Sequence, residues 1–214
     1  VAEGGDDRSR AIALETAAIV DMNEGRTDRA TARWETALGL YRRHGDAGGV
    51  ARILDGQAMA TFLDGRITDA VTVFDRVARL FIDSGDLLRV VTPRSTRGHG
   101  LVFLGRPQAG LEDASAALEL AIDLDAPEGQ AYALWHRSEA LSALGRTAEA
   151  AADAREALAI ARAIDHQGWI ATAQRALGIA FQTAGDLDAA AGAFAASGEA
   201  AGESLTLFAA WAAA

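Results

Sequence analysis

A glycine stands at the same place in every block of 40 residues, and this spacing constrains the fold more than any other feature of the sequence. Arginine follows this glycine in the first four blocks, and aspartate follows it in the fifth. Glycines that recur in phase over many blocks indicate a repeat protein, in which each block is one unit stacked on the next. The five turn glycines are Gly25, Gly65, Gly105, Gly145 and Gly185.

Other positions repeat in phase with the turn glycine. Alanine, glycine or serine occupies the position seven residues before it and the position five residues after it in all five blocks. Nine residues after it, the side chain is bulky in three blocks and small in the other two. This pattern predicts two helices per block, hinged at the glycine, whose backbones approach closely at small residues while a large side chain fills the gap beside them. The residues at this position are Trp34, Phe74, Ala114, Ala154 and Phe194.

This arrangement resembles a tetratricopeptide repeat array, and the resemblance covers residues 11–202. That motif has a small residue in its first helix, a turn glycine, and then alanine, an aromatic residue and alanine in its second helix. The block is 40 residues long rather than 34, and the family's proline after the second helix is missing. HEAT repeats also have a spacing near 40 residues, but their proline-bent first helix is not seen. The residues that match best are Gly178, Phe181, Gly185, Ala190 and Phe194.

The resemblance implies an all-α fold, a right-handed α-solenoid of five helix-turn-helix repeats plus a terminal helix. We expect residues 1–9 to be a disordered or frayed end, because they lack apolar periodicity. Pro93 lies within an expected helix, and we predict a kink there or a break at Thr92. The array itself spans 10–202, with repeats at about 10–45, 46–85, 86–125, 126–165 and 166–202, followed by a terminal or truncated helix at 203–214.

The net charge and the amino-acid composition limit which partners and which cellular location we expect. The net charge of −10 argues against direct binding of nucleic acid, which needs a concentrated positive surface. The chain has no cysteine, which is typical of a reducing compartment, and it has no apolar run long enough to span a membrane, so we expect a cytoplasmic location. Because the chain begins at Val1 rather than at methionine, we expect a processed chain or a fragment of a longer protein.

The sequence carries no motif that indicates catalysis. It has no glycine-rich phosphate loop, no His-Glu-x-x-His, no Gly-x-Ser-x-Gly and no calcium loop. The histidines fall in different repeats, so we expect surface or partly buried imidazoles and no metal site. We therefore expect no enzyme activity and no cofactor. These histidines are His44, His99, His136 and His166.

In tetratricopeptide folds the first helices line a concave groove, so the resemblance also implies which positions face a ligand. These positions lie six, ten and thirteen residues before the turn glycine. They lack the lysine and asparagine with which one subclass grips the two carboxylates of a peptide terminus. The candidate positions are Ile19, Met59, His99, Glu139 and Ile179, then Glu15, Asp55, Ser95, Trp135 and Arg175, then Ile12, Arg52, Thr92, Tyr132 and Thr172.

One group in this groove could anchor a ligand. Arginine forks beside aromatic faces are common anchors for a peptide carboxylate, an acidic helix or a planar ligand. The alternative is that the tryptophan packs between neighbouring repeats and the arginines are solvated. Met59 and Phe62 could form a second, apolar anchor, or could equally pack against the neighbouring hairpin. The predicted binding residues are Arg94, Arg97, His99, Tyr132, Trp135, Glu139, Asp55, Met59 and Arg175.

These observations favour an interaction module that binds a protein or peptide in its groove. Long alanine-rich repeats resemble those that follow the ATPase unit in bacterial transcriptional regulators of the LuxR and antibiotic-regulatory types. Contact with another domain of the same polypeptide would fit that context. The alternatives are a free-standing receptor for a peptide or small-molecule signal, and a homo-oligomeric scaffold. For the scaffold, a homodimer would form through the apolar residues Leu205, Leu207, Phe208 and Trp211.

Overall fold

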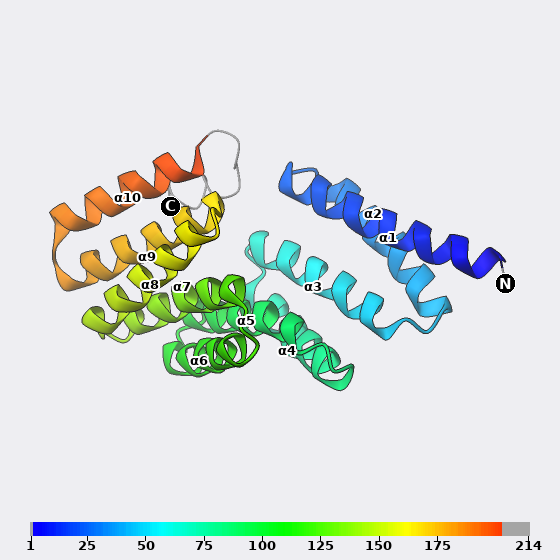
Figure 1. Cartoon of the computed structure of the whole chain (residues 1–214), viewed down its shortest axis with the longest axis horizontal. Coiled ribbons are helices and arrows are strands. Elements are labelled where there is room, and N and C mark those ends of the chain that lie inside the picture. Colours follow the sequence, from blue (N-terminus) through cyan, green and yellow to red (C-terminus); the bar gives the residue numbers. More distant parts are fainter. Residues whose placement is uncertain (1, 203–214) are drawn as a thin grey trace. The chain divides into compact units, whose positions relative to one another are not determined.

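The computed structural model describes residues 2–202, and this part of the chain is built from helices alone. Figure 1 shows them as successive antiparallel hairpins, which is the predicted all-α repeat architecture. Most helices are 17 residues long, so each rises by roughly 25 Å. The elements are α1 (Ala2–Asn23), α2 (Thr27–Arg43), α3 (Ala47–Leu63), α4 (Ile67–Asp83), the 3₁₀ helix η1 (Leu87–Val90), α5 (Val91–Phe103), α6 (Pro107–Asp123), α7 (Pro127–Ala143), α8 (Thr147–Ala163), α9 (Gln167–Ala184) and α10 (Leu187–Ala201).

Each helix from α1 to α9 ends in the same hydrogen-bonded turn. In the turn after α2, the Gly45 amide donates to the carbonyl of Arg42, and the Asp46 amide donates to that of Tyr41. This is a Schellman motif, which needs one residue in the left-handed region. Glycine occupies that position in seven of the nine turns, and aspartate occupies it in two, with φ of 49° at Asp125 and 54° at Asp165. The repeat in the backbone is therefore a helix and a turn every 20 residues, half of the predicted block.

Small residues set the distance between the two helices of each hairpin, as predicted. A Cβ on Gly98 would lie 2.8 Å from the carbonyl oxygen of Gly110, so only glycine fits where α5 and α6 cross. In the next hairpin the Ser138 hydroxyl donates to the Ala150 carbonyl across the same gap. A Cβ on Gly178 would lie 2.6 Å from the ring of Phe194, which shows how a large side chain takes the space that glycine leaves.

The chain divides into two compact units, and the first comprises Val1–Asp86 with helices α1–α4. Its core includes Trp34 and the nearly buried Tyr41. The Tyr41 hydroxyl donates to Glu15 at 2.6 Å, and Arg52 binds the other carboxylate oxygen at 2.7 Å. Burial and then the Glu15 carboxylate raise the pKa of Tyr41 to about 12. Glu15 and Arg52 are both groove positions in the sequence pattern, yet here they join α1 to α3.

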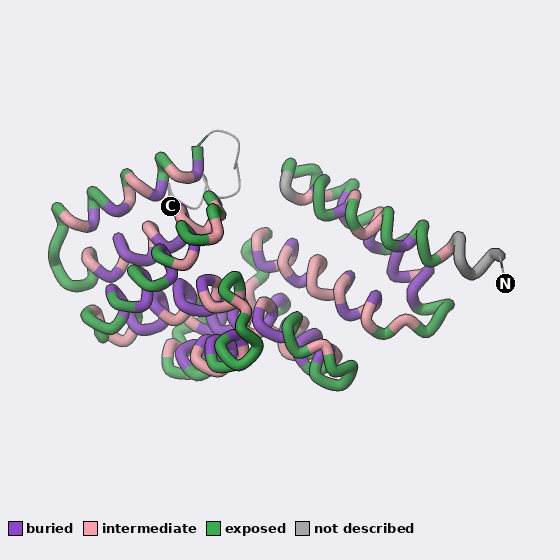
Figure 2. Tube along the Cα trace, viewed as in Figure 1, coloured by how far each residue is buried: buried purple, intermediate pink, exposed green. Residues whose placement is uncertain are grey.

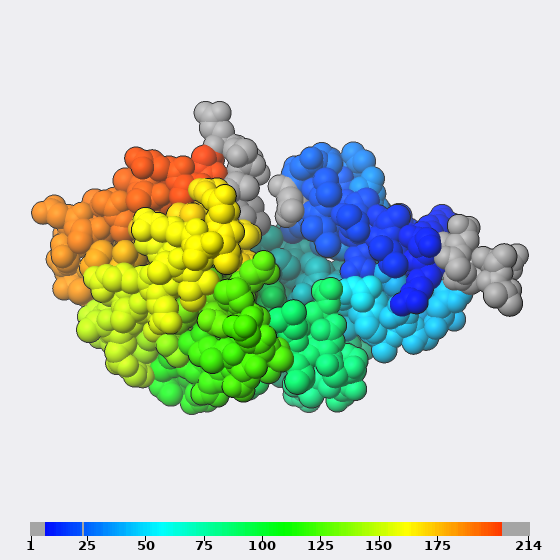
Figure 3. Space-filling model, viewed as in Figure 1, coloured from blue at the N-terminus to red at the C-terminus, as the bar shows by residue number. Residues whose placement is uncertain are grey.

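The second unit begins at Leu87 and contains η1 and α5–α10. Its helices pack beside one another in chain order, green through yellow to orange in Figure 3. One apolar core of alanine and leucine with Trp135 runs through α6, α7, α8 and α9. Figure 2 shows buried and exposed positions alternating along most helices, as expected for amphipathic helices stacked on one side. Each unit thus has its own core.

Three expectations from the sequence need correction or lie beyond the described residues. Helix α1 begins at Ala2, so the backbone of residues 2–9 is helical rather than frayed, and Asp7 contacts Arg43, the last residue of α2, and His44, which follows it. The break near Pro93 falls earlier than Thr92, between η1 and α5. Pro93 is the third residue of α5, where an amide has no partner within the helix and proline is tolerated. The predicted terminal helix at 203–214 lies outside the described residues.

The close contact in the third hairpin can be tested with two glycine-to-alanine substitutions. Gly98→Ala should lower the free energy of unfolding by about 1–3 kcal/mol, because the new methyl group overpacks the backbone of α6. Gly192→Ala is the matched control in α10, where a Cβ meets nothing within 4 Å, and it should raise stability by up to about 1 kcal/mol through helix propensity. Urea denaturation of both variants measures this. Equal effects of the two substitutions would show that the close approach is absent.

The aspartates with a left-handed backbone conformation allow a test in which two aspartate-to-glycine substitutions should change the stability in opposite directions. Asp125→Gly should stabilise the chain by about 1 kcal/mol, because glycine adopts this backbone conformation without the clash of a Cβ. Asp123→Gly removes the same charge two residues earlier, at the last residue of α6, where the backbone is still helical, and should destabilise the chain by about 0.5–1 kcal/mol. Thermal melts of both variants report the sign. A destabilising Asp125→Gly would contradict the turn geometry.

Candidate functional site

The first helices of three hairpins surround one cavity in the second unit. The cavity has a volume of about 220 Å³ and lies against α5, α7 and α9. Three of its lining residues, His99, Glu139 and Ile179, occupy the position six residues before the turn glycine, as predicted for groove residues. We call it the first-helix cavity. Its lining is His99, Val102, Phe103, Glu139, Ser142, Ala143, Arg175, Ile179 and Thr183.

Three linked polar side chains form the polar part of the first-helix cavity. The Glu139 carboxylate binds His99 Nε2 at 2.6 Å with one oxygen and Arg175 Nη1 at 2.5 Å with the other. His99 and Glu139 are buried, and the Arg175 side chain is about one-fifth exposed. Because each residue comes from a different helix, the chain of charges joins α5, α7 and α9. A buried carboxylate flanked by two donors fixes all three side chains in place.

The environment of Glu139 favours its charged form. Burial alone opposes ionisation, but the charges and hydrogen bonds of His99 and Arg175 outweigh it and hold the pKa of this carboxyl below its ordinary value of 4.5. The neighbouring His136 behaves differently, because complete burial and then the charge of His99 lower its pKa well below 6.5. His136 is therefore neutral at pH 7, directly behind a charged pair.

Aromatic rings fill the space behind the charges. The His99 ring lies 5.5 Å from Trp135 and 4.8 Å from His136, measured between ring centroids. Tyr132 lies edge-on to Trp135 at 5.6 Å, and its hydroxyl forms a hydrogen bond of 2.9 Å with Thr96. Trp135 is only 2% exposed, so it packs between repeats rather than facing a ligand. His99 and His136, which we expected at the surface or partly buried, are both buried and lie side by side here.

The arginines of the predicted cationic rim, Arg94 and Arg97, bind an aspartate of their own hairpin. Arg97 makes a bidentate pair with Asp113 of α6 at 2.6 and 3.1 Å, and Arg94 approaches the same carboxylate at 3.6 Å. The same pair recurs forty residues later, where Arg137 binds Asp153 at 2.6 and 2.8 Å. These arginines cross-link the two helices of a hairpin, which differs from both the anchor and the solvated alternatives considered from the sequence.

The remaining predicted residues belong to the first unit. Asp55 and Met59 are half-buried on α3. Phe62 is buried and packs edge-on against Phe74 at 6.4 Å between centroids, so it belongs to the hairpin's packing. A ligand-binding role for Asp55 and Met59 stays a prediction.

The sequence reasoning missed the apolar wall of the first-helix cavity. This wall is formed largely by residues two or three positions before the turn glycine, such as Val102, Phe103 and Ala143. They lie one helical turn beyond the predicted position at minus six, on the same helix face. Continuing the groove pattern in steps of three and four residues would have found them.

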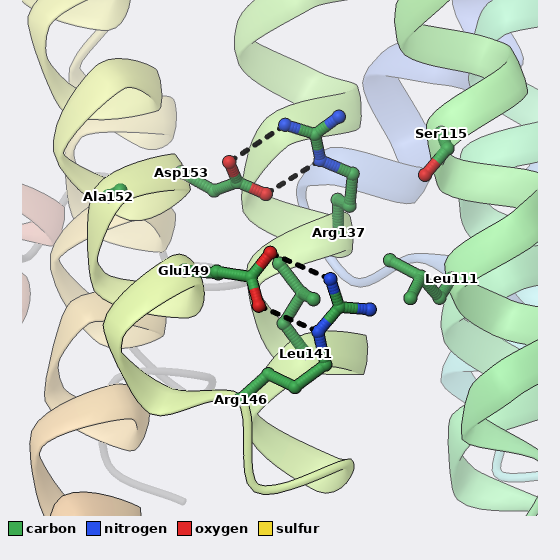
Figure 4. A pocket seen from close by; sticks show the side chains of 8 residues that line it. All are labelled: Leu111, Ser115, Arg137, Leu141, Arg146, Glu149, Ala152 and Asp153. Carbon is green, nitrogen blue, oxygen red and sulfur yellow. Dashed lines mark hydrogen bonds and ion pairs between the residues drawn. The ribbon is translucent and has the colours of Figure 1, made fainter.

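A second cavity of about 350 Å³ lies in the second unit against α6, α7 and α8 (Figure 4). Two ion pairs lie in its wall: Arg137 binds Asp153, and Arg146 binds Glu149 at 2.7 and 2.8 Å. Figure 4 shows each guanidinium facing the carboxylate that it binds. The charges in this wall therefore neutralise each other in pairs.

The stacking of hairpins explains this second cavity. The first unit has a cavity of about 290 Å³ at the equivalent place, and Gln57 and Arg66 in it correspond to Arg137 and Arg146, eighty residues later. Between the last two hairpins, Phe181 stands at the position equivalent to Leu141, forty residues later, and the Arg155 guanidinium lies 5.6 Å from the centroid of its ring. A notch that recurs with the repeat is a product of its geometry, so we do not take it as the functional site.

Across residues 2–202, no group of three histidine or acidic side chains is placed to hold a metal ion. Nor does this part contain a helix that is both long enough and apolar enough to cross a bilayer.

Several solved structures share this fold. BtubC (BKLC) from P. vanneervenii superimposes with a TM-score of 0.67 at 16% identity, covering 93% of this chain and 88% of that one. The nearly identical TPR-like repeats of a kinesin light chain from Podosopora anserina give 0.63 at 14% identity, with 90% and 95% covered. MamA from Desulfovibrio magneticus RS-1 gives 0.54 at 17% identity, with 89% and 94% covered. No protein-family model and no curated protein matches the sequence.

These likenesses establish the fold. The chain is a tetratricopeptide-like α-solenoid, as the in-phase glycines and small residues predicted. At identities of 14–17% they carry no information about ligands or partners, so the functional argument depends on the cavity itself.

The pKa of Glu139 predicts how acid affects the first-helix cavity. A depressed folded-state pKa contributes stability that is fully present above about 4.5 and is lost as the pH falls through the folded value. Glu139→Gln should therefore lower the free energy of unfolding by about 3 kcal/mol at pH 7, because His99 and Arg175 both lose the charge of the buried carboxylate that binds them. The difference between variant and wild type should shrink below pH 4.5, as urea denaturation at several pH values would show. A difference independent of pH would contradict the charged state.

Proposed function

We propose that this protein is an interaction module that binds a segment of a partner protein or a peptide over the first helices of its second unit. The observation that carries the proposal is the first-helix cavity, which three successive repeats build together. Ligand sites in proteins are concave, mostly apolar and rigid, with a few fixed polar groups. The cavity has these properties, and its size suits part of a larger ligand rather than a whole small molecule.

Rigidity supports this proposal. Glu139 binds both His99 and Arg175, and these two contacts hold α5, α7 and α9 together before any ligand binds. A site that is already ordered loses less conformational entropy when it binds. Phe103, at the edge of the cavity, is 58% exposed, so its ring is accessible to a partner.

The wider context remains the prediction drawn from repeat length and composition. We propose that the module is the sensor or regulatory repeat domain of a bacterial transcriptional regulator, acting in the cytoplasm. In that case its partner segment could come from another domain of the same polypeptide. A free-standing receptor for a peptide or small-molecule signal would use the same cavity. A homo-oligomeric scaffold that dimerises through residues 203–214 would not need it.

Photo-crosslinking can test the binding face. A benzophenone amino acid in place of Phe103 should give adducts with a partner protein in lysate of the source organism. The same residue in place of Ile122 is the matched control, because Ile122 is 56% exposed on α6, away from the cavity. Adducts formed from position 103 should disappear in an Ile179→Asp background. Equal adducts at both positions, or none at position 103, would contradict the proposal.

A further inference from the structure

The charges in the first-helix cavity are already engaged with each other. Glu139 uses one carboxylate oxygen for His99 and the other for Arg175, at 2.6 and 2.5 Å. A charged ligand group entering here would lose its water and would have to compete with a bonded, buried pair for a counter-charge. An uncharged group has no such cost.

The remaining wall of the cavity is mainly apolar. Val102 and Phe103 come from the end of α5, Ala143 comes from the end of α7, and Ile179 comes from α9. The Phe103 ring lies 4.7 Å from the His99 ring, so its position is supported from behind while 58% of the residue is exposed. Together these side chains present apolar surface from three helices around one hollow.

We infer that the first-helix cavity takes one large uncharged side chain, aliphatic or aromatic, from the partner segment. This inference rests on the proposed function and names the chemistry of its anchor. Such a side chain suits the cavity because the charged residues of the lining bind one another, and the remaining wall is mainly apolar. A peptide carboxylate or an acidic helix, the ligands suggested by the predicted arginine rim, fits poorly because Arg97 is committed to Asp113. The backbone of the partner would then run across the three helices.

Single-residue probes can test the anchor chemistry without knowing the partner. N-acetyl-leucinamide and N-acetyl-phenylalaninamide would be titrated into the full chain and followed by amide chemical shifts in NMR spectra. We expect saturable shifts at Phe103, Ala143 and Ile179, with affinities at least about tenfold higher than those of N-acetyl-lysinamide and N-acetyl-glutamic acid amide, because burial of an apolar side chain drives binding. Equal or stronger binding of either charged probe would overturn the inference.

Two matched variants place the effect in the cavity. Ala143→Leu should fill the hollow and abolish the shifts, whereas Ala152→Leu, an equally exposed alanine in the notch of the second cavity, should leave them unchanged. Loss of binding in both variants, or in neither, would overturn the assignment. The crosslinking experiment separates the two proposals. If adducts form at position 103 while no apolar probe binds, the interaction face stands and the anchor chemistry is wrong.

Discussion

The left-handed turn at every twentieth residue is the constraint on which the other features depend. It ends one helix every 20 residues, so that residues 40 apart occupy the same place on neighbouring first helices, as His99 and Glu139 do. Small residues then bring the two helices of a hairpin together, as at Gly98 and Gly110. The regular backbone also places side chains from three repeats around the first-helix cavity. A change of one residue in any helix would rotate the following positions by about 100° and separate them.

Ion pairs are the second organising feature, and they act as cross-links. Arg97 joins the two helices of its own hairpin, and Arg137 does the same in the next one. Glu139 joins the first helices of three hairpins, and Arg52 joins two in the first unit. Most charges at groove positions therefore connect repeats to each other. The surface that remains for a partner is therefore mainly apolar. For this reason we propose an uncharged side chain as the group that binds there.

The sequence predicted the fold well because backbone constraints repeat. Glycine in the turns and small residues at helix crossings leave a pattern that needs no knowledge of the structure. Side-chain pairing leaves a weaker pattern, because arginine and aspartate stand at the positions of Arg97 and Asp113 in only one other block, as Arg137 and Asp153, and each contact depends on the angle between two helices. The pattern of first-helix positions correctly placed His99, Glu139 and Arg175 on the cavity. It could not show that they bind one another.

A double-mutant cycle between Glu139 and Arg175 tests the central claim, that charges at groove positions hold neighbouring repeats together. Glu139→Gln, Arg175→Gln and the double variant would be compared with the wild type by urea denaturation at pH 7. The account predicts a coupling free energy of about 1.5 kcal/mol or more, because the pair is short and Glu139 is buried. A coupling below about 0.3 kcal/mol, the range of independent sites, would mean that the two residues act separately. Their charges would then be available to a ligand.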